Sequence, residues 1–127
     1  MSVGPASSSL PLVSVVIPTH GRPEALRRAL ESVLAQDYAG AIEVIIVHDK
    51  EAPDLALASS GDHRRGIVVS KSRKPGASGA RNTALLLATG DLIGSLDDDD
   101  LWFETKLSKQ VAALEDAGGW GGITHLQ

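Results

Sequence analysis

The fold is decided by residues 13–49, which read VSVVIPTHGRPEALRRALESVLAQDYAGAIEVIIVHD. The stretch Val13–Ile17 is apolar and β-branched and stops at Pro18, which is typical of a buried strand that ends in a loop. Residues 23–36 open with Pro and Glu and then repeat Leu and Val on one helical face, so they are predicted to form an amphipathic helix. A second buried strand follows at residues 42–47.

The same alternation of strand and helix continues along the rest of the chain. The predicted strands are residues 13–17, 42–47, 67–69, 92–96 and 123–126. The predicted helices are residues 23–36, a short one at 54–58, one at 80–88 capped by Ser78 or Gly79, and one that carries Leu107, Val111 and Leu114 and ends at Gly118-Gly119. This order predicts an α/β fold with a mainly parallel sheet flanked by helices. In such sheets, ligands bind beyond the carboxyl ends of the strands.

Composition narrows the classes of function. The 127 residues suit one domain, and with only 3% aromatic residues the core must consist of Val, Ile, Leu and Ala. The net charge of −4 argues against a nucleic-acid partner, and the absence of cysteine excludes disulfides and thiolate-zinc sites. No stretch approaches the roughly 18 apolar residues of a transmembrane segment. Residues 1–11 are predicted to be a flexible leader without signal-peptide character, and a cytoplasmic protein is the default expectation.

Four consecutive carboxylates, Asp97–Asp100, follow the fourth predicted strand. They repel one another, and a hard divalent cation relieves that repulsion while it binds the phosphates of a substrate. The metal would also stabilise the charge of a departing diphosphate. The alternative is that Asp100 caps the next helix and its neighbours are merely solvated.

Other polar residues fall at the same predicted edge of the sheet. Asp49 ends the second strand, where it can accept hydrogen bonds from a base or ribose or can instead make an ordinary Asx turn. Arg81, at the start of a helix, suits a phosphate group, whereas the loop residues Lys71, Arg73 and Lys74 read individually as solvated cations. The four histidines show no metal-ligand spacing and are predicted to be polar loop or surface residues. Glycine-rich dinucleotide and P-loop patterns are absent.

Several motifs together resemble the family 2 glycosyltransferases, which have the GT-A fold. The matching stretches are VSVVIPTHGRP at 13–23, LESVLAQ at 30–36, GARN at 79–82, ATGD at 88–91, and LDDDDLW at 96–102 with Lys106-Leu107 beyond it. The last of these resembles the DxD segment of the family. The resemblance covers residues 13–114, and its motifs occur in the family's order.

This resemblance implies a Rossmann-like GT-A domain over residues 12–127 that binds a nucleotide-diphosphate sugar and is incomplete at its C-terminus. It implies the following roles: Pro18 and Thr19, with His20 beside them, line the nucleotide pocket; Asp49 bonds the base; Arg81 lies near the diphosphate; Asp97 and Asp98 contact ribose or sugar; and Asp99 ligates Mn²⁺ or Mg²⁺. In this family the hydroxyl of a glycan or other acceptor displaces the nucleoside diphosphate with inversion, assisted by a carboxylate base.

The chain departs from the family pattern at two places. His48 replaces the first of two adjacent acids, and Asp49-Lys50-Glu51 replaces the common Asp-Gly-Ser. No residue matches the family's catalytic base, so the catalytic residue is unknown and the chain is expected to bind the donor with little or no transfer. A non-catalytic nucleotide-sugar-binding or assembly module is the alternative function, and an α/β interaction domain with structural Ca²⁺ is a third. An unfinished sheet edge and apolar surface would allow self-association.

Overall fold

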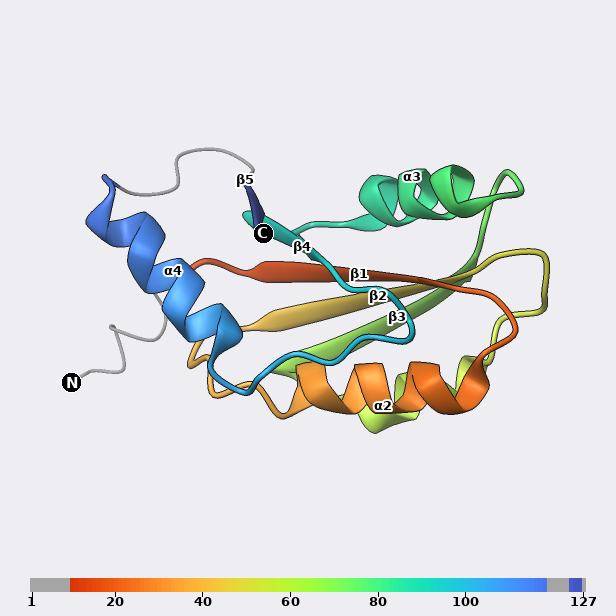
Figure 1. Ribbon diagram of the computed structural model, residues 1–127, viewed down its shortest axis with the longest axis horizontal. Coiled ribbons are helices and arrows are strands. Elements are labelled where there is room, and N and C mark those ends of the chain that lie inside the picture. The colour runs from red at the N-terminus through yellow and green to blue at the C-terminus, as the bar shows by residue number, and fades with distance from the viewer. Residues whose placement is uncertain (1–9, 119–123, 127) are drawn as a thin grey trace.

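The computed structural model describes residues 10–118 and the backbone of residues 124–126. Strands and helices alternate along these residues, as the sequence predicts (Figure 1). The elements are β1 (Val13–Thr19), α2 (Pro23–Leu34), β2 (Ile42–His48), the 3₁₀ helix η1 (Leu55–Ser60), β3 (Arg65–Lys71), α3 (Ala77–Leu87), β4 (Leu92–Ser95), α4 (Lys106–Asp116) and β5 (Thr124–Leu126). Every helix in the described part of the chain is too short or too polar to cross a membrane.

The strands form one parallel sheet in the order β3-β2-β1-β4-β5. The chain adds β2 and β3 on one side of β1 and then crosses to add β4 on the other side. The order of the strands therefore reverses between β1 and β4, and the loops that leave these two strands separate there. A reversal of this kind opens a crevice at the carboxyl ends of the strands, where α/β proteins bind ligands.

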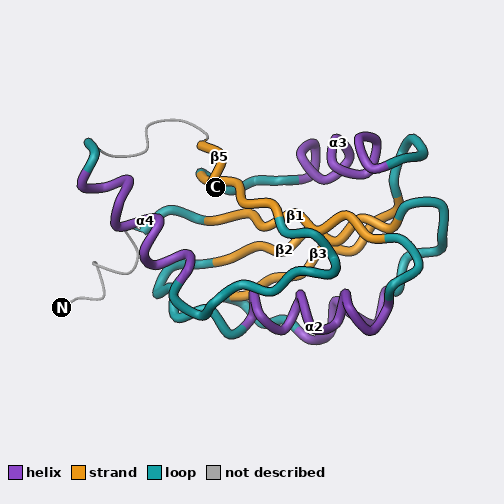
Figure 2. Tube along the Cα trace, viewed as in Figure 1, coloured by secondary structure: helices purple, strands orange, loops and turns teal. Residues whose placement is uncertain are grey.

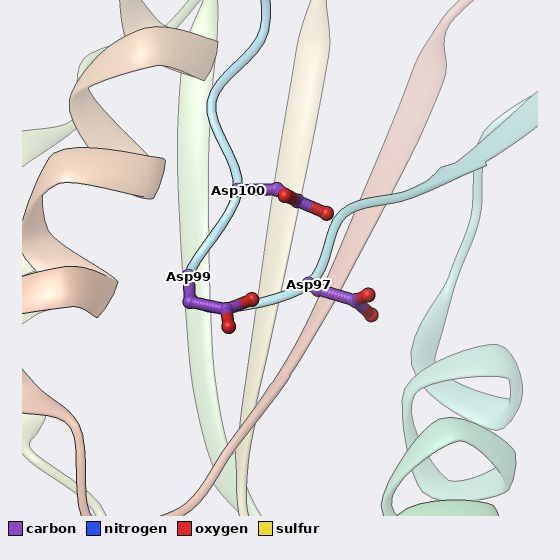
Figure 3. A group of neighbouring side chains, drawn as sticks. All are labelled: Asp97, Asp99 and Asp100. Carbon is purple, nitrogen blue, oxygen red and sulfur yellow. The ribbon is translucent and has the colours of Figure 1, made fainter.

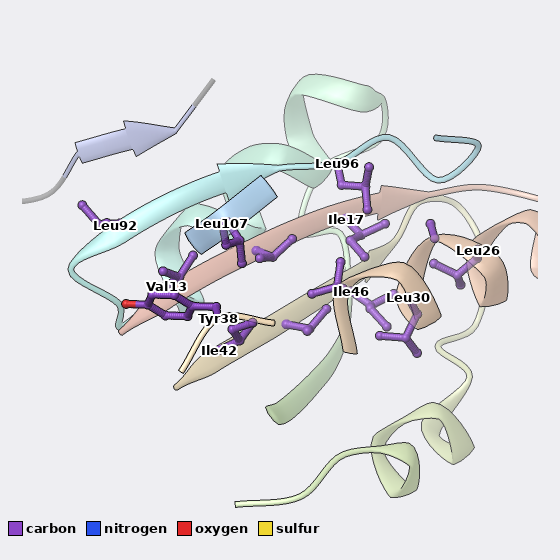
Figure 4. Packing of buried hydrophobic residues seen from close by; sticks show 14 of the residues in the cluster. Val13, Ile17, Leu26, Leu30, Tyr38, Ile42, Ile46, Leu92, Leu96 and Leu107 are labelled. Atoms are coloured by element: carbon purple, nitrogen blue, oxygen red, sulfur yellow. The ribbon is translucent and has the colours of Figure 1, made fainter. Parts of the chain in front are cut away.

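The two faces of the sheet are covered by different helices. Alternate residues of β1 point to opposite faces because a strand repeats every two residues. Val13, Val15 and Ile17 pack with the apolar stripes of α2 and α4, which gives the larger core cluster (Figure 4). Val16 faces the other way, toward a smaller cluster under α3. Figure 1 accordingly shows α2 and α3 on opposite sides of the sheet.

Element boundaries differ from the prediction in places where backbone pairing outweighs side-chain pattern. The strand predicted at 67–69 extends over Arg65–Lys71, because an edge strand pairs its backbone with β2 without needing apolar residues at its ends. The helix predicted from residue 80 begins at Ala77 with Gly76 at its N-cap, so the prediction that Ser78 or Gly79 caps it is wrong. The first helix ends at Leu34, two residues early.

The leader predicted at residues 1–11 lies mostly outside the described residues. Its last two residues contact the folded domain instead of leading away from it. Leu10 packs against the larger core cluster, and the buried Tyr38 hydroxyl donates a hydrogen bond to the carbonyl of Pro11. Contacts with the core thus begin before β1.

Candidate donor-binding site

All eight predicted site residues line one cavity of about 380 Å³ at the carboxyl ends of β1, β2 and β4. The lining residues are Pro18, Thr19, His20, Arg22, Asp49, Ala77, Ala80, Arg81, Asp97, Asp98 and Asp99. This cavity lies where the strand order reverses between β1 and β4. The topology thus brings together residues that lie up to 81 positions apart (18 to 99) in the sequence.

Asp98 is the buried member of the acidic run, with 7% of its surface exposed. Its Oδ2 accepts hydrogen bonds from the Thr19 hydroxyl at 2.8 Å and from the His20 amide at 3.4 Å. Its Oδ1 accepts from the Arg22 guanidinium at 3.2 Å. Asp98 therefore joins the loop after β4 to the loop after β1, and both of its oxygens are already engaged.

The other three carboxylates of the run are exposed and lie close together. The side chains of Asp97, Asp99 and Asp100 each offer an oxygen, and these oxygens all lie within 4.8 Å of one another. Figure 3 shows the three side chains projecting from one loop toward a common side. Carboxylate oxygens at this spacing suit a hard divalent cation, which gathers several oxygen ligands.

The structure rejects the capping alternative for the acidic run. Figure 2 shows loop between β4 and α4, and α4 begins only at Lys106, with Thr105 at its N-cap. Asp100 precedes that cap by five residues (105 − 100), so it cannot cap the helix. No helix start in this loop accounts for the acidic run.

Arg22 is a residue of the site that the sequence interpretation missed. The family resemblance gives it no role, and it is the N-cap residue of α2, just outside the helix. Its guanidinium is 3.2 Å from Asp98 and 2.8 Å from Asp99 Oδ2. Its position in the loop after β1, at the same edge of the sheet as Asp97–Asp100, was the signal that could have found it.

Asp49 joins β2 to the start of α3. It is buried, and its Oδ1 accepts a hydrogen bond from the Gly76 amide at 3.0 Å. An Asx turn would instead direct the carboxylate to the amide two residues later, so the Asx-turn alternative is wrong. Among the described residues, Oδ2 of Asp49 has no hydrogen-bond partner, which leaves it available to a ligand in the cavity.

Arg81 lies near the start of α3 and lines the cavity, and it is exposed. The basic residues Lys71, Arg73 and Lys74 are exposed and are not among the lining residues, in agreement with the prediction that they are solvated.

The absence of a side chain at Gly79 has a structural reason. A Cβ there would lie 2.2 Å from the carbonyl oxygen of Lys74, so the loop packs too closely for any side chain.

His48 contradicts the prediction that the histidines are loop or surface residues. It is the last residue of β2, and only 3% of its surface is exposed. Its Nδ1 lies 2.8 Å from Oε2 of Glu51, and this hydrogen bond holds the pKa of Glu51 below its usual range. His20 and His63 are exposed as predicted, and the side chain of His125 lies outside the described residues.

Comparison with known proteins gives one family. A family model described as Glycosyl transferase family 2 matches residues 14–122. The Escherichia coli UDP-Glc:alpha-D-GlcNAc-diphosphoundecaprenol beta-1,3-glucosyltransferase WfaP is 36% identical over 105 residues, which cover 82% of this chain and 41% of WfaP. The amylovoran biosynthesis glycosyltransferase AmsB of Erwinia amylovora is 38% identical over 114 residues, 85% of this chain and 37% of AmsB. The chain thus spans about two fifths of the length of these relatives.

Solved structures of similar fold agree with this result. The structure of TarS from S. aureus superposes with a TM-score of 0.71 at 25% identity, over 82% of this chain and 19% of that one. The mannosyltransferase PcManGT from Pyrobaculum calidifontis, solved in complex with GDP-Man and Mn²⁺, superposes with a TM-score of 0.67 at 26% identity, over 85% of this chain and 33% of that one.

Proposed function

Because the chain belongs to glycosyl transferase family 2 and has the GT-A fold, we propose that it supplies the donor site for transfer of a sugar from a nucleoside diphosphate to a hydroxyl acceptor. The observation that carries the proposal is the convergence of polar residues from three strand ends and α3 on one cavity. Since the chain spans 41% of the length of WfaP, the transfer activity of the whole protein is part of the proposal.

The acidic run is proposed to hold a divalent metal ion, Mn²⁺ or Mg²⁺. Asp99 is the proposed ligand, and the Asp97 and Asp100 oxygens within 4.8 Å give the crowded negative charge that such an ion neutralises. When bound, the metal would stabilise the charge that develops on the departing diphosphate. Arg22, which contacts Asp99 at 2.8 Å, must share or yield this carboxylate when a metal binds.

The nucleotide is proposed to lie between the end of β1 and the start of α3. Asp49 Oδ2 would accept a hydrogen bond from the base, and Pro18, Thr19 and His20 would form the wall of the pocket. Arg81 lines the cavity from α3, where a guanidinium suits a diphosphate oxygen. For the ribose or sugar, Asp97 is the more available carboxylate, because Asp98 is buried and engaged by three donors.

The reaction is proposed to invert the anomeric centre. An acceptor hydroxyl would attack in line, and the bond to the nucleoside diphosphate would break as the new glycosidic bond forms. A carboxylate base would take the proton of the hydroxyl. We assign that base to none of the described residues, since the acids of the cavity all have proposed roles in holding the donor.

The names of two related proteins support the class of donor. WfaP is named for UDP-Glc, and PcManGT was solved with GDP-Man and Mn²⁺. These donors share a nucleoside diphosphate and differ in base and sugar. The proposal for this chain is therefore a nucleotide-diphosphate sugar with a divalent metal, and a glycan or other hydroxyl compound as acceptor.

Thermal unfolding with UDP and GDP, with and without Mn²⁺, tests this proposal. A ligand that binds only the native state at 100 times its Kd stabilises it by about 2.7 kcal/mol, so the expected result is a clear rise in Tm that requires the metal. Inorganic phosphate with Mn²⁺ is the control for a nonspecific anion effect. If neither nucleotide shifts the Tm in the presence of metal, the donor-site proposal is wrong.

A further inference from the structure

Glu51 lies behind the cavity wall and is bound on two sides. Its Oε1 accepts a hydrogen bond of 2.7 Å from the amide of Gly21, in the loop between β1 and α2. Its Oε2 lies 2.8 Å from Nδ1 of His48. One carboxylate thus joins the end of β2 to the turn formed by His20, Gly21 and Arg22, across 30 residues of sequence.

The position of the imidazole proton of His48 shows how many hydrogen bonds Glu51 must accept. Nε2 of His48 accepts a hydrogen bond from the backbone amide of Asp54 at 3.2 Å, so Nε2 carries no proton and Nδ1 must be the donor. Glu51 therefore faces two donors, the Nδ1–H group of His48 and the N–H group of Gly21. A carboxylate has an oxygen for each, whereas a carboxamide has only one acceptor. A glutamine at position 51 would therefore lose one of the two hydrogen bonds. Because only 4% of the His48 side chain is exposed, water has little access to replace it.

The turn that Glu51 holds also touches the acidic run. On the cavity side, the His20 amide donates to Asp98 at 3.4 Å, and the Arg22 guanidinium reaches Asp98 and Asp99 at 3.2 and 2.8 Å. The turn is therefore anchored to Asp98 in front and to Glu51 behind. The place of the Arg22 cation beside the proposed metal ligand depends on both anchors.

The residues that flank the turn, Thr19 and Pro23, border open space. A second cavity, of about 170 Å³, lies there and is lined by Thr19, Pro23, Leu26, His48, Glu51, Ala52, Asp54 and Leu57. Thr19 lines both cavities, so the end of β1 is a thin wall between them. Glu51 lines the second cavity, and its hydrogen bond from the Gly21 amide ties the loop after β1 to the loop after β2.

Lys50, just before Glu51, has a φ of +58°, a left-handed conformation that residues with a side chain rarely adopt. Such a conformation persists only where surrounding contacts impose it. The two hydrogen bonds of Glu51 are contacts of this kind, since they fix the residue that follows.

We propose that Glu51 is a positioning residue of the donor site: by accepting hydrogen bonds from Gly21 and His48 at once, it fixes the turn of residues 20–22 against the acidic run. This inference rests on the proposed function, and it adds a residue that does not line the donor cavity. Glu51 acts through Arg22 and His20, and we do not expect it to contact the nucleotide sugar itself.

The first measurement uses the unmodified chain. The ¹⁵N chemical shifts of the His48 ring are expected to show a neutral imidazole protonated at Nδ1, and the Gly21 amide proton is expected to be protected from exchange. A ring protonated at Nε2, or a rapidly exchanging Gly21 amide, would overturn the proposal. This result does not depend on whether any variant folds.

The second measurement compares Glu51→Gln with Glu31→Gln, which removes the same charge from an exposed residue of α2. Calorimetric titration with UDP or GDP in the presence of Mn²⁺ is expected to show about tenfold weaker binding for Glu51→Gln, as for other residues that orient a ligand from behind. The Gly21 amide resonance should move in the same variant, at a temperature where it is fully folded. Glu31→Gln should leave both unchanged.

Two negative outcomes are distinguishable. If the unmodified chain binds nucleotide and Glu51→Gln binds it equally well, the positioning role is overturned and the proposed function stands. If the unmodified chain binds no nucleotide with Mn²⁺, the proposed function fails, and the positioning role fails with it.

Discussion

The two ends of the sheet use polar residues in opposite ways. At the amino end, the Ser14 hydroxyl donates to Glu43 at 2.7 Å and accepts from the Gly90 amide at 2.8 Å. Glu43 also accepts from the amide and hydroxyl of Thr89, each at 2.9 Å. These groups bind one another and form a closed network that joins β1, β2 and the loop before β4.

Arg65, at the start of β3, belongs to the same end of the sheet. Its guanidinium donates to the carbonyl oxygens of Gln36, Tyr38 and Gly40 at 3.2, 2.6 and 2.8 Å. Carbonyl groups in the connection from α2 to β2 have few backbone partners, and Arg65 supplies the donors that they need. The hydrogen bonds of this guanidinium thus all go to carbonyl groups of the fold itself.

The carboxyl end satisfies Asp98 but leaves much of the remaining charge of the acidic run unmatched. Asp97, Asp99 and Asp100 lie together, and among the described residues only Arg22 forms an ion pair with any of the three. The comparison teaches that residue type alone does not mark a functional site. Both ends are rich in polar residues, and the end whose groups lack partners within the chain is the one suited to a ligand.

The largest effect is expected at the amino end. Arg65→Met should lower the free energy of unfolding by about 2–3 kcal/mol, because it leaves carbonyl oxygens without the charged donor that they bind. Urea unfolding measures this loss. Arg27→Met, at an exposed position of α2, is the matched control and should change stability little. Nucleotide binding should survive in both variants. If Arg65→Met loses it at a temperature where the variant is folded, the claim that the amino end serves only stability is wrong.

A second effect at the amino end appears at high pH. Burial, followed by the charges of Glu115 and Asp91, raises the pKa of Tyr38 to about 12 from its usual value of 10. The native state therefore keeps the Tyr38 proton where the unfolded state loses it. Stability should be fully present below pH 10 and should fall as the pH rises from 10 toward 12.

Tyr38 is the only tyrosine of the chain, so the ultraviolet absorbance of tyrosinate reports this residue alone. In the native protein, the tyrosinate absorbance should therefore appear only at pH values well above 10. Titration near pH 10 in the folded protein would show that the hydroxyl is accessible to water, and the amino end would then be less closed than described.

The smallest effect is expected at the carboxyl end. Asp99→Asn removes an ion pair with Arg22 in which both side chains are more than half exposed, and it also removes repulsion within the acidic run. These opposing changes should leave the stability of the metal-free protein within about 0.5 kcal/mol. Thermal unfolding without metal measures it. A loss of several kcal/mol would show that Asp99 is a structural residue.

Much of the fold follows from periodicity, and the remainder depends on contacts that periodicity does not contain. The apolar runs of β1 and β2 and the stripe of α2 were readable because buried faces repeat at the period of their element. The ends of β3 could not be predicted from the sequence, since an edge strand needs only backbone pairing there. The start of α3 was missed because Gly76, its N-cap, is held by Asp49 from 27 residues away.

The candidate site was predictable to the extent that parallel strands bring their carboxyl ends together. That rule placed Asp49, Arg81 and Asp97–Asp100 at one edge, and the structure brings them to one cavity, except Asp100, which is not among its lining residues. The same rule could have placed Arg22 at this edge, but it could not predict the ion pairs of Arg22 with Asp98 and Asp99. The burial of His48 was not predictable either, because it depends on side-chain direction at the end of a strand. A histidine that ends a strand reads as a loop residue until its partner, Glu51, is known.

Titration of Mn²⁺ into the chain, with and without UDP or GDP, tests the central claim most directly, and the spectroscopic signal of free Mn²⁺ gives the amount bound. We predict that Mn²⁺ binds more tightly when a nucleoside diphosphate is present, and that Asp99→Asn abolishes this increase while the variant stays folded. An Mn²⁺ affinity that is the same with and without nucleotide, and the same in Asp99→Asn, would contradict the account.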